Sequence, residues 1–133
     1  MTLLKKILEQ QGGDIENKVA AFERTLQSSY PELDKVGMYY DRSNGSLFLS
    51  DLYVKEEHRG TGVGTKVMNS ITKFADTENL PIVLIPEPDD DNVSPKKLMD
   101  FYKKFGFIIN KGKRMDYTFS MPFATTMYRM PRS

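Results

Sequence analysis

Hydrophobic positions recur at helical spacing in several stretches of the chain, and each stretch predicts an amphipathic helix. Residues 3–11 predict a first helix, which the glycine pair at 12–13 ends, because glycine commonly follows the last turn of a helix. Residues 14–30 predict a second helix that stops before a proline. Two further helices are predicted at 63–75, after a glycine-rich loop, and at 94–105.

Other stretches are rich in β-branched and aromatic residues and predict strands. The predicted strands cover residues 36–40, 47–54, 82–85, 107–109 and 124–130. The first two form a hairpin, because Asn44 and Gly45 between them both tolerate positive φ. The run at 82–85 is continuously apolar, as in a central strand that is covered on both faces. The basic and aromatic segment 111–123 has room for one more short strand.

Length and composition limit the class of protein. The 133 residues form a single domain, 1–133, that is long enough to bury one core. A formal net charge of +1 favours neither nucleic acid nor a membrane surface. The absence of cysteine excludes disulfides and thiolate metal sites, and with a single histidine we expect no metal site. No apolar run approaches the roughly 20 residues that cross a bilayer, and lysines break the opening segment, so a cytoplasmic location is expected.

The chemistry is concentrated where the strand at 47–54 meets the helix at 63–75. Arg59 is followed there by Gly60, Gly62 and Gly64. Glycines let the backbone approach a bulky anion, and the first N–H groups of the next helix point at its charge. This loop therefore predicts a site for a phosphorylated cofactor, although a tight glycine turn that only links strand to helix is the plain alternative.

Two common phosphate-binding motifs do not fit this loop. A Walker A loop requires Gly-Lys-Ser/Thr in direct succession, whereas Thr65 separates Gly64 from Lys66. The dinucleotide motif G-x-G-x-x-G requires a wider second spacing than the G-x-G-x-G found here. The pattern that does fit is Arg-x-x-Gly-x-Gly from Arg59 to Gly64, preceded by Leu-Tyr-Val.

This pattern resembles the pyrophosphate loop of the GCN5-related N-acetyltransferases (GNAT), and LMDFYKKFGF at 98–107 is similar to a later segment of the same family. The resemblance, slightly nearer the small amine and polyamine acetyltransferases, implies the α/β GNAT fold. That fold has a mixed central sheet of about six strands flanked by about four helices. The family's usual first strand is not found, so the N-terminus is expected to be truncated or rearranged.

The resemblance implies that acetyl-CoA is the acetyl donor. It also implies that the strand at 52–54 splays away from the strand at 82–85, so that its main chain can pair with the pantetheine. The residues assigned to the cofactor are Leu52, Tyr53, Val54, Arg59, Gly60, Thr61, Gly62, Val63, Gly64, Thr65, Ser94 and Tyr102. Tyr102 occupies the position of the tyrosine that donates a proton to the departing thiolate; the alternative is a core tyrosine.

The general base is less well determined. Some members of the family carry a glutamate where this chain has Phe48, so their mechanism does not transfer. Asp51, Glu87 and Asp89 remain as candidates, because a carboxylate can take the proton of an acceptor ammonium and also attract it. His58 lies in the loop beside the expected phosphates and is a weaker candidate.

We therefore expect an N-acetyltransferase in which a primary amine, on a small molecule, a polyamine or a protein lysine, attacks acetyl-CoA directly. A homodimer is possible, because a second subunit can complete a short sheet. The alternative hypothesis is a catalytically degenerate GNAT-fold protein that binds CoA or another protein, suggested by Phe48 and by Pro95, where the family often has asparagine. A third hypothesis, nucleic-acid binding through segment 111–123, fits the charge balance poorly.

Overall fold

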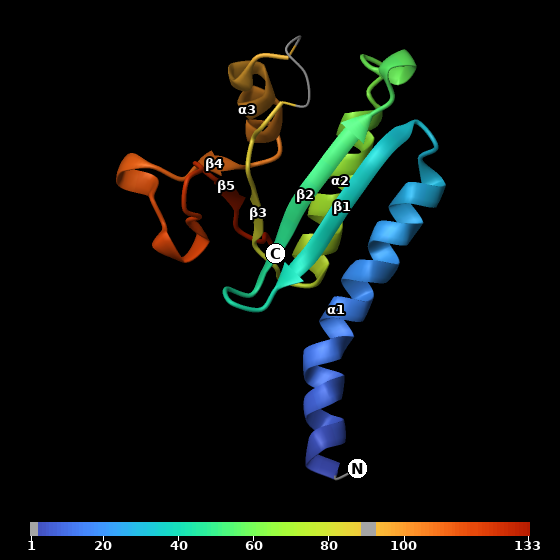
Figure 1. Cartoon of the computed structure of the whole chain (residues 1–133), viewed down its shortest axis with the longest axis vertical. Coiled ribbons are helices and arrows are strands. Elements are labelled where there is room, and N and C mark those ends of the chain that lie inside the picture. The colour runs from blue at the N-terminus through green and yellow to red at the C-terminus, as the bar shows by residue number, and fades with distance from the viewer. Residues whose placement is uncertain (1–2, 89–92) are drawn as a thin grey trace.

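The computed structural model describes residues 3–88 and 93–133, with side chains described from residue 13 onward. The helices are α1 (Leu3–Ser29), α2 (Val63–Thr77) and α3 (Pro95–Lys103), with short 3₁₀ helices at Glu56–His58, Gly112–Arg114 and Tyr117–Phe119. The strands are β1 (Leu33–Asp41), β2 (Ser46–Val54), β3 (Ile82–Leu84), β4 (Ile108–Ile109) and β5 (Met127–Arg129). This is the predicted α/β class, with five strands instead of about six and three α-helices instead of about four (Figure 1).

The strands form one mixed sheet in the order β1-β2-β3-β5-β4. β1 and β2 are the predicted antiparallel hairpin, and β3 then runs parallel to β2 after the crossover through α2. In the hairpin turn only Gly45 has positive φ, at 70°, because the loop has four residues instead of two. β5 is antiparallel to both of its neighbours, β3 and β4, which leaves β4 at one edge of the sheet.

Alternate residues of the central strands enter two separate cores. Leu47, Leu49 and Leu84 belong to the larger cluster, which also contains side chains of all three α-helices. Phe48 and Val83 point the other way, into a smaller cluster with Phe119 and Tyr128. All three helices therefore cover one face of the sheet, and the segment between β4 and β5 covers part of the other.

The two N-terminal helices predicted at 3–11 and 14–30 are a single helix, α1, so that prediction was wrong. The chain continues helically through Gly12 and Gly13, and Asp14 lies inside the helix instead of capping it. A glycine inside a helix costs only about 1 kcal/mol relative to alanine, which the packing of the second half can offset. Part of that packing is the ring of Phe22, stacked 4.3 Å from the ring of Phe74 on α2. The first turns of α1 extend beyond the end of the sheet (Figure 1).

β2 separates from β3 half-way along its length, as the family resemblance implied. The two strands pair from Leu47 to Leu49, where β3 ends, while β2 continues to Val54. At this point Ser50 is an extra residue in β2, because Gly37 of β1 pairs with Asp51 and the next residue pairs with Leu49. Such a β-bulge bends and twists a strand. The bulge thus accompanies the divergence that opens the site described below.

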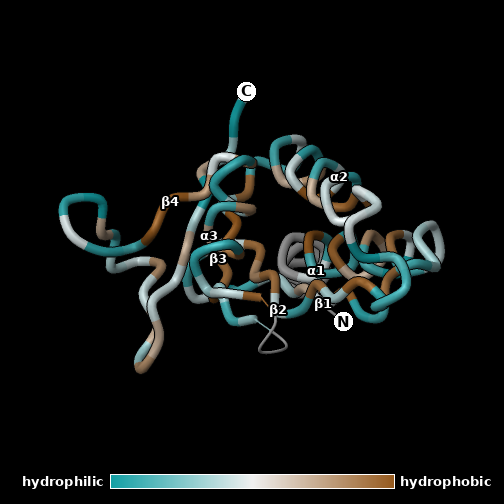
Figure 2. The backbone as a smooth tube through the Cα atoms, turned by 90° about the horizontal axis from the view of Figure 1, so that it is seen from above, coloured by the Kyte–Doolittle hydropathy of each residue, from teal (hydrophilic) through white to brown (hydrophobic). Residues whose placement is uncertain are grey.

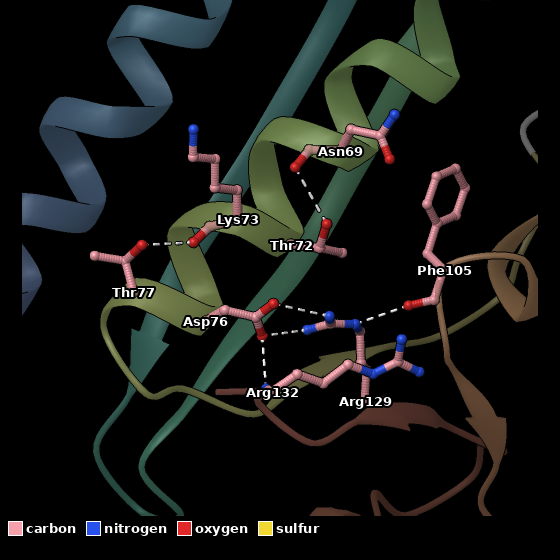
Figure 3. A network of polar contacts seen from close by, with 8 residues as sticks. All are labelled: Asn69, Thr72, Lys73, Asp76, Thr77, Phe105, Arg129 and Arg132. Carbon is pink, nitrogen blue, oxygen red and sulfur yellow. Dashed lines mark hydrogen bonds and ion pairs between the residues drawn. The ribbon is translucent and has the colours of Figure 1, made fainter.

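An ion pair with a buried arginine joins β5 to the ends of α2 and α3 (Figure 3). The guanidinium of Arg129 on β5 donates two hydrogen bonds, of 2.8 and 3.1 Å, to the carboxylate of Asp76 near the end of α2. Its Nε donates a third, of 2.7 Å, to the carbonyl of Phe105 just after α3. Arg129 is 4% exposed and the side chain of Asp76 is 27% exposed, so this network fixes the ends of both helices against β5 with the guanidinium shielded from water and the carboxylate partly open to it.

The last strands are shorter than predicted. β4 covers two of the three residues predicted at 107–109, and β5 covers only the centre of the predicted run 124–130. The extra strand expected within 111–123 is replaced by two 3₁₀ helices and one isolated bridge between Met121 and Ala124. In the part of the chain that the structure describes, no helix has the length and apolarity needed to span a bilayer.

Candidate functional site

Two neighbouring cavities occupy the space where β2 diverges from β3. The glycine-loop cavity, of about 330 Å³, lies between the end of β2, the start of α2 and one face of α3. The carboxylate cavity, of about 190 Å³, lies between β2, the segment after β3 and the same helix. Leu52, Leu98 and Tyr102 line both cavities. The two cavities therefore meet at Tyr102.

The N-terminus of α2 opens into the glycine-loop cavity. Its N-cap is Gly62, with φ of 86° and without a side-chain cap, and the first N–H to bond back to it is that of Lys66. The preceding amides of Val63, Gly64 and Thr65 have no acceptor one turn back, since no residue of the helix precedes them there. These N–H groups and the helix dipole favour an anion in this cavity, and the phosphate site predicted for the loop stays a prediction that this geometry supports.

The glycines of the loop are needed for two different reasons. Gly60 and Gly62 both have positive φ, which permits the tight turn into α2. Gly64 instead faces α3, and a Cβ added to it would lie 3.5 Å from the ring of Phe101. The guanidinium of Arg59 donates a 3.2 Å hydrogen bond to the carbonyl of Val54. This bond holds Arg59, which is predicted to bind the phosphates, at the end of β2 that has no partner on its β3 side.

Tyr102 lines both cavities, at the place where they meet. The residue is 7% exposed, and its ring packs edge-on against Phe101 and Phe107. In the described part of the chain every buried side-chain nitrogen or oxygen has a hydrogen-bond partner, and the Tyr102 hydroxyl makes no such bond. The hydroxyl is therefore not fully enclosed. Burial, and to a smaller extent Tyr53, raises the pKa of Tyr102 to about 12, so the phenol is protonated at neutral pH.

Two of the three predicted carboxylates line the carboxylate cavity, Asp51 and Glu87. The Asp51 carboxylate accepts a 2.9 Å hydrogen bond from the Ser50 hydroxyl and lies 3.6 Å from the ammonium of Lys35. Glu87 is exposed and lies just beyond β3. The third candidate, Asp89, lies outside the described residues. The cavity thus places acidic oxygens on the opposite side of Tyr102 from the anion site.

Not every residue predicted for the cofactor faces the glycine-loop cavity. Tyr53 lines the carboxylate cavity instead. The Thr61 hydroxyl donates to the carbonyl of His58 within the turn, at 2.6 Å, while His58 itself lines the glycine-loop cavity. Ser94 accepts a 3.1 Å hydrogen bond from the amide of Lys97 and lines neither cavity, so its hydroxyl serves as the predicted N-cap of α3. A cofactor contact by Ser94 remains a prediction.

Comparison with known proteins identifies the family. Residues 7–109 match the model of the Acetyltransferase (GNAT) domain. The chain belongs to the GNAT acetyltransferase family. Membership confirms the predicted enzyme class, an acetyl-CoA-dependent N-acetyltransferase whose acceptors are amines, and leaves open which amine this member uses. No curated protein matches the chain.

Solved structures share the fold at low sequence identity. An acetyltransferase of the GNAT family from Staphylococcus aureus superposes with a TM-score of 0.53 and 19% identity, over 73% of this chain and 58% of that one. The anti-CRISPR protein AcrVA5 gives a TM-score of 0.52 at 19% identity, over 70% and 85% of the two chains. Ard1 from Thermoplasma volcanium gives 0.51 at 21% identity, over 82% and 77%. These similarities support the architecture and not a particular acceptor.

The sequence analysis missed residues that shape the carboxylate cavity of this GNAT domain. A Cβ on Gly37 would lie 2.7 Å from a carboxylate oxygen of Asp51 and 2.8 Å from the Ser50 hydroxyl, so this glycine makes room for the bulge. Leu98, one turn before Tyr102, forms part of the wall of both cavities. A glycine inside a predicted strand was the available signal, because it often marks a bulge or a close approach.

Proposed function

We propose that this GNAT domain binds acetyl-CoA across the two cavities and transfers its acetyl group to a primary amine. The diphosphate would occupy the glycine-loop cavity, against the free amides of α2, with Arg59 beside it. The pantetheine would follow β2 between Leu52 and Val54, where the strand pairs with β1 on one side and has no partner on its β3 side, and would satisfy the main-chain groups on that open side. The thioester then reaches Tyr102, where the cavities meet. This shared position of Tyr102 is the observation that carries the proposal.

The reaction needs no covalent enzyme intermediate. The neutral amine nitrogen attacks the thioester carbonyl, the C–N bond forms, and the oxygen becomes an oxyanion that a main-chain N–H of β2 near Leu52 to Val54 stabilises. Before this attack the acceptor ammonium loses one proton, directly or through water, to a carboxylate of the carboxylate cavity, and after it the nitrogen loses a second proton to water. The carbonyl re-forms as the C–S bond breaks, and the departing sulfur takes a proton supplied through Tyr102, which solvent then replaces.

The raised pKa of Tyr102 defines its part in this scheme. A phenol with a pKa of about 12 is fully protonated when the thiolate departs, so the hydroxyl always has a hydrogen to donate. A phenol of ordinary pKa, about 10, is already a weaker acid than a thiol of about 8.5, and the shift widens this difference. A strong hydrogen bond to the sulfur therefore precedes full proton transfer, and the benefit lies in stabilising developing negative charge.

Asp51 and Glu87 suit the acceptor side because amines arrive as ammonium ions. Two carboxylates beside one small cavity raise the local concentration of a cation and provide a destination for its proton. Lys35 already neutralises part of the charge on Asp51. Glu87, which is exposed, is then the better candidate for the base. The sites on the two sides of Tyr102 thus have opposite charge preferences, anion on one side and cation on the other.

The proposal is tested by measuring acetyl-CoA binding calorimetrically and CoA thiol release with a panel of primary amines. We expect saturable binding and amine-dependent release. In Tyr102→Phe we expect kcat to fall about 100-fold, the lower range for loss of a positioned acid, with little change in the dissociation constant for acetyl-CoA. Tyr128→Phe, which removes a hydroxyl bonded to the Arg114 carbonyl outside both cavities, is the matched control.

Three results separate this proposal from a degenerate binding module. Absence of heat with acetyl-CoA would exclude cofactor binding altogether. Binding without thiol release from any amine would favour the module. Full turnover in Tyr102→Phe would remove Tyr102 from the chemistry while leaving the cofactor site intact.

A further inference from the structure

Two more cavities continue from the carboxylate cavity along α3. A bridging cavity, of about 330 Å³, shares Ile85 and Glu87 with the carboxylate cavity. It also shares Ile109 and Lys111 with a fourth, of about 380 Å³, at the free edge strand β4. Because adjoining cavities share lining residues, they form a series that leads from the proposed reaction centre to the edge of the sheet.

The face of α3 follows the same path. Pro95 and Met99 line the bridging cavity, and Lys103 lines the fourth. These positions are four residues apart, so they lie on one side of the helix. Leu98 and Tyr102 lie on the adjacent side, toward the reaction centre. One helix thus lines the reaction centre and the path that leaves it.

The fourth cavity is strongly basic, and we name it the cationic groove. Lys103, Lys111, Lys113 and Arg114 line it together with apolar residues of β4, and none of its lining residues is acidic among those the structure describes. Lys103 lies 4.0 Å from Asp100 on its own helix. Within residues 13–88 and 93–133, no carboxylate pairs with the other three cations. The chain as a whole has a net charge of only +1, so this positive charge is local.

The segment that carries these cations is held in place by a buried side chain. Asn110, 5% exposed, accepts a hydrogen bond from the amide of Asp116 and donates to its carbonyl and to the hydroxyl of Thr126. The Tyr128 hydroxyl also donates to the Arg114 carbonyl at 2.6 Å. Figure 2 shows this hydrophilic segment standing out from the sheet after β4. Because these hydrogen bonds hold the segment after β4 in place, the cationic groove is already formed in the protein without a partner.

Phe123 adds an unusual apolar contact surface to the same path. It lines the bridging cavity, is fully exposed, and has φ of 69°, a conformation that bulky side chains rarely adopt. Exposing a large aromatic ring on a strained backbone costs free energy in the isolated protein. Such features are concentrated at sites where another molecule binds.

We propose, on the basis of the function proposed above, that the acceptor is a polypeptide whose reactive amine is followed by acidic residues. The amine enters the carboxylate cavity as an ammonium ion, the chain crosses the bridging cavity beside Phe123, and its carboxylates lie against Lys111, Lys113 and Arg114. The protein presents acidic groups first and basic groups next along this path, and the acceptor presents a cation first and carboxylates next, so the two sets of charges are complementary. A small polyamine, cationic along its whole length, fits the first cavity and is repelled by the groove.

The spacing follows from the geometry of α3. The eight steps from Pro95 to Lys103 along the nine-residue helix span about 12 Å at 1.5 Å per residue. An extended peptide covers about 3.3 Å per residue, so it crosses this distance in about four residues. Allowing one or two residues within the carboxylate cavity, the acidic residues belong about four to six positions after the amine.

The test uses two fluorescent peptides with a free terminal amine that differ only at about the fifth to seventh positions, glutamate in one and glutamine in the other. Anisotropy titrations measure binding to the full chain, and thiol release measures kcat/KM for the unlabelled peptides. We expect the glutamate peptide to bind about tenfold more tightly at low salt, with a matching gain in kcat/KM and a smaller difference at high salt. Lys111→Glu/Lys113→Glu should abolish the preference, and Arg24→Glu, on the exposed face of α1, should keep it.

Equal affinity for the two peptides in the wild type, or a preference that survives the double charge reversal, would overturn the proposal. A single-stranded RNA that displaces the glutamate peptide at lower concentration than the unlabelled peptide does would assign the groove to nucleic acid and also overturn it. The underlying transferase activity is measured separately with an uncharged small primary amine. Release from that amine without any peptide preference would reject the acceptor class alone, and no release with any acceptor would reject the transfer reaction.

Discussion

The two cavities that meet at Tyr102 are built from different parts of the chain. In the glycine-loop cavity the polar groups are main-chain amides at the start of α2, and the glycines are there to expose them. In the carboxylate cavity the polar groups include the side chains of Asp51, from β2, and Glu87, from the segment after β3. A main-chain site depends on a short local pattern, whereas a side-chain site can change by single substitutions. The glycine-loop cavity could therefore be predicted from neighbouring residues, whereas the carboxylate cavity depends on the tertiary structure.

The largest effect is expected for Arg129, because the helices that line the two cavities, α2 and α3, are held by this one residue. Arg129→Met removes the ion pair with Asp76 and the hydrogen bond to the Phe105 carbonyl, which together fix the ends of α2 and α3. Breaking a buried pair by removing one partner costs about 3 kcal/mol in the free energy of unfolding, measured by urea titration. The exposed Arg24→Met should change this value by less than about 0.5 kcal/mol. A similar, small loss in both variants would show that the two helices are held by apolar packing alone.

A substitution in the glycine loop should affect only the cofactor side. Gly62→Ala places a methyl group on a residue with φ of 86° and disturbs the amides that follow it. The unfavourable conformation costs about 1 kcal/mol of stability, and the dissociation constant for acetyl-CoA should rise about tenfold or more in calorimetry.

Gly45→Ala is a close control, because Gly45 also has positive φ, of 70°, in the distant hairpin turn. It should lose a similar amount of stability and keep its affinity for acetyl-CoA. If both variants keep that affinity, the start of α2 is not the diphosphate site.

Removing the acidic charges should affect the other half. Asp51→Asn combined with Glu87→Gln should raise KM for a cationic amine about fivefold, since charges that are at least partly exposed contribute less than about 1 kcal/mol each, and should also lower kcat because the proposed base is lost. The affinity for acetyl-CoA should stay within about twofold of the wild type, which steady-state kinetics and calorimetry together would show. Asp34→Asn with Glu56→Gln removes two charges outside the cavity and should leave KM unchanged. Weaker binding of acetyl-CoA together with an unchanged KM for the amine would show that the two cavities have the opposite roles.

The smallest expected effect is a dependence of stability on acid pH. Hydrogen bonding from Arg129 holds the pKa of Asp76 below its ordinary value, despite partial burial, so the stabilisation is complete above about pH 4. It is lost as the pH falls through the lowered pKa and the carboxylate is protonated in the folded state. The difference in unfolding free energy between the wild type and Asp76→Asn should therefore narrow between pH 7 and pH 3. A difference that is the same at both values would mean that the carboxylate charge does not contribute.

The contrast between the cavities also explains which features could be predicted from the sequence. The glycine loop, the start of α2 and the Ser94 cap of α3 depend on residues within a few positions of one another, and the structure has each element where it was predicted. The single helix α1 was missed because two glycines disfavour a helix by only a small amount, which contacts with α2 outweigh. Local preferences say nothing about such distant contacts.

The acceptor side depends on distant contacts throughout. The bulge at Ser50 exists because Gly37, thirteen positions earlier, leaves space for it, and no local rule connects the two residues. The segment after β4 is shaped by Asn110 and Thr126, from opposite ends of the connection to β5. The carboxylates could be named as candidates, but their position relative to Tyr102 required the tertiary structure.

The bulge at Ser50 does not stand alone in the hairpin. On the neighbouring strand, Asp34 is an extra residue between Leu33 and Lys35, and the two additions offset one another in the pairing register. Only the stretch between them, opposite Asp51 to Tyr53, is displaced, while the turn at one end and the approach to the glycine loop at the other keep their alignment. Deleting Asp34 and Ser50 together would therefore keep the register at both ends of the hairpin and change only the wall that Asp51 to Tyr53 contribute to the carboxylate cavity.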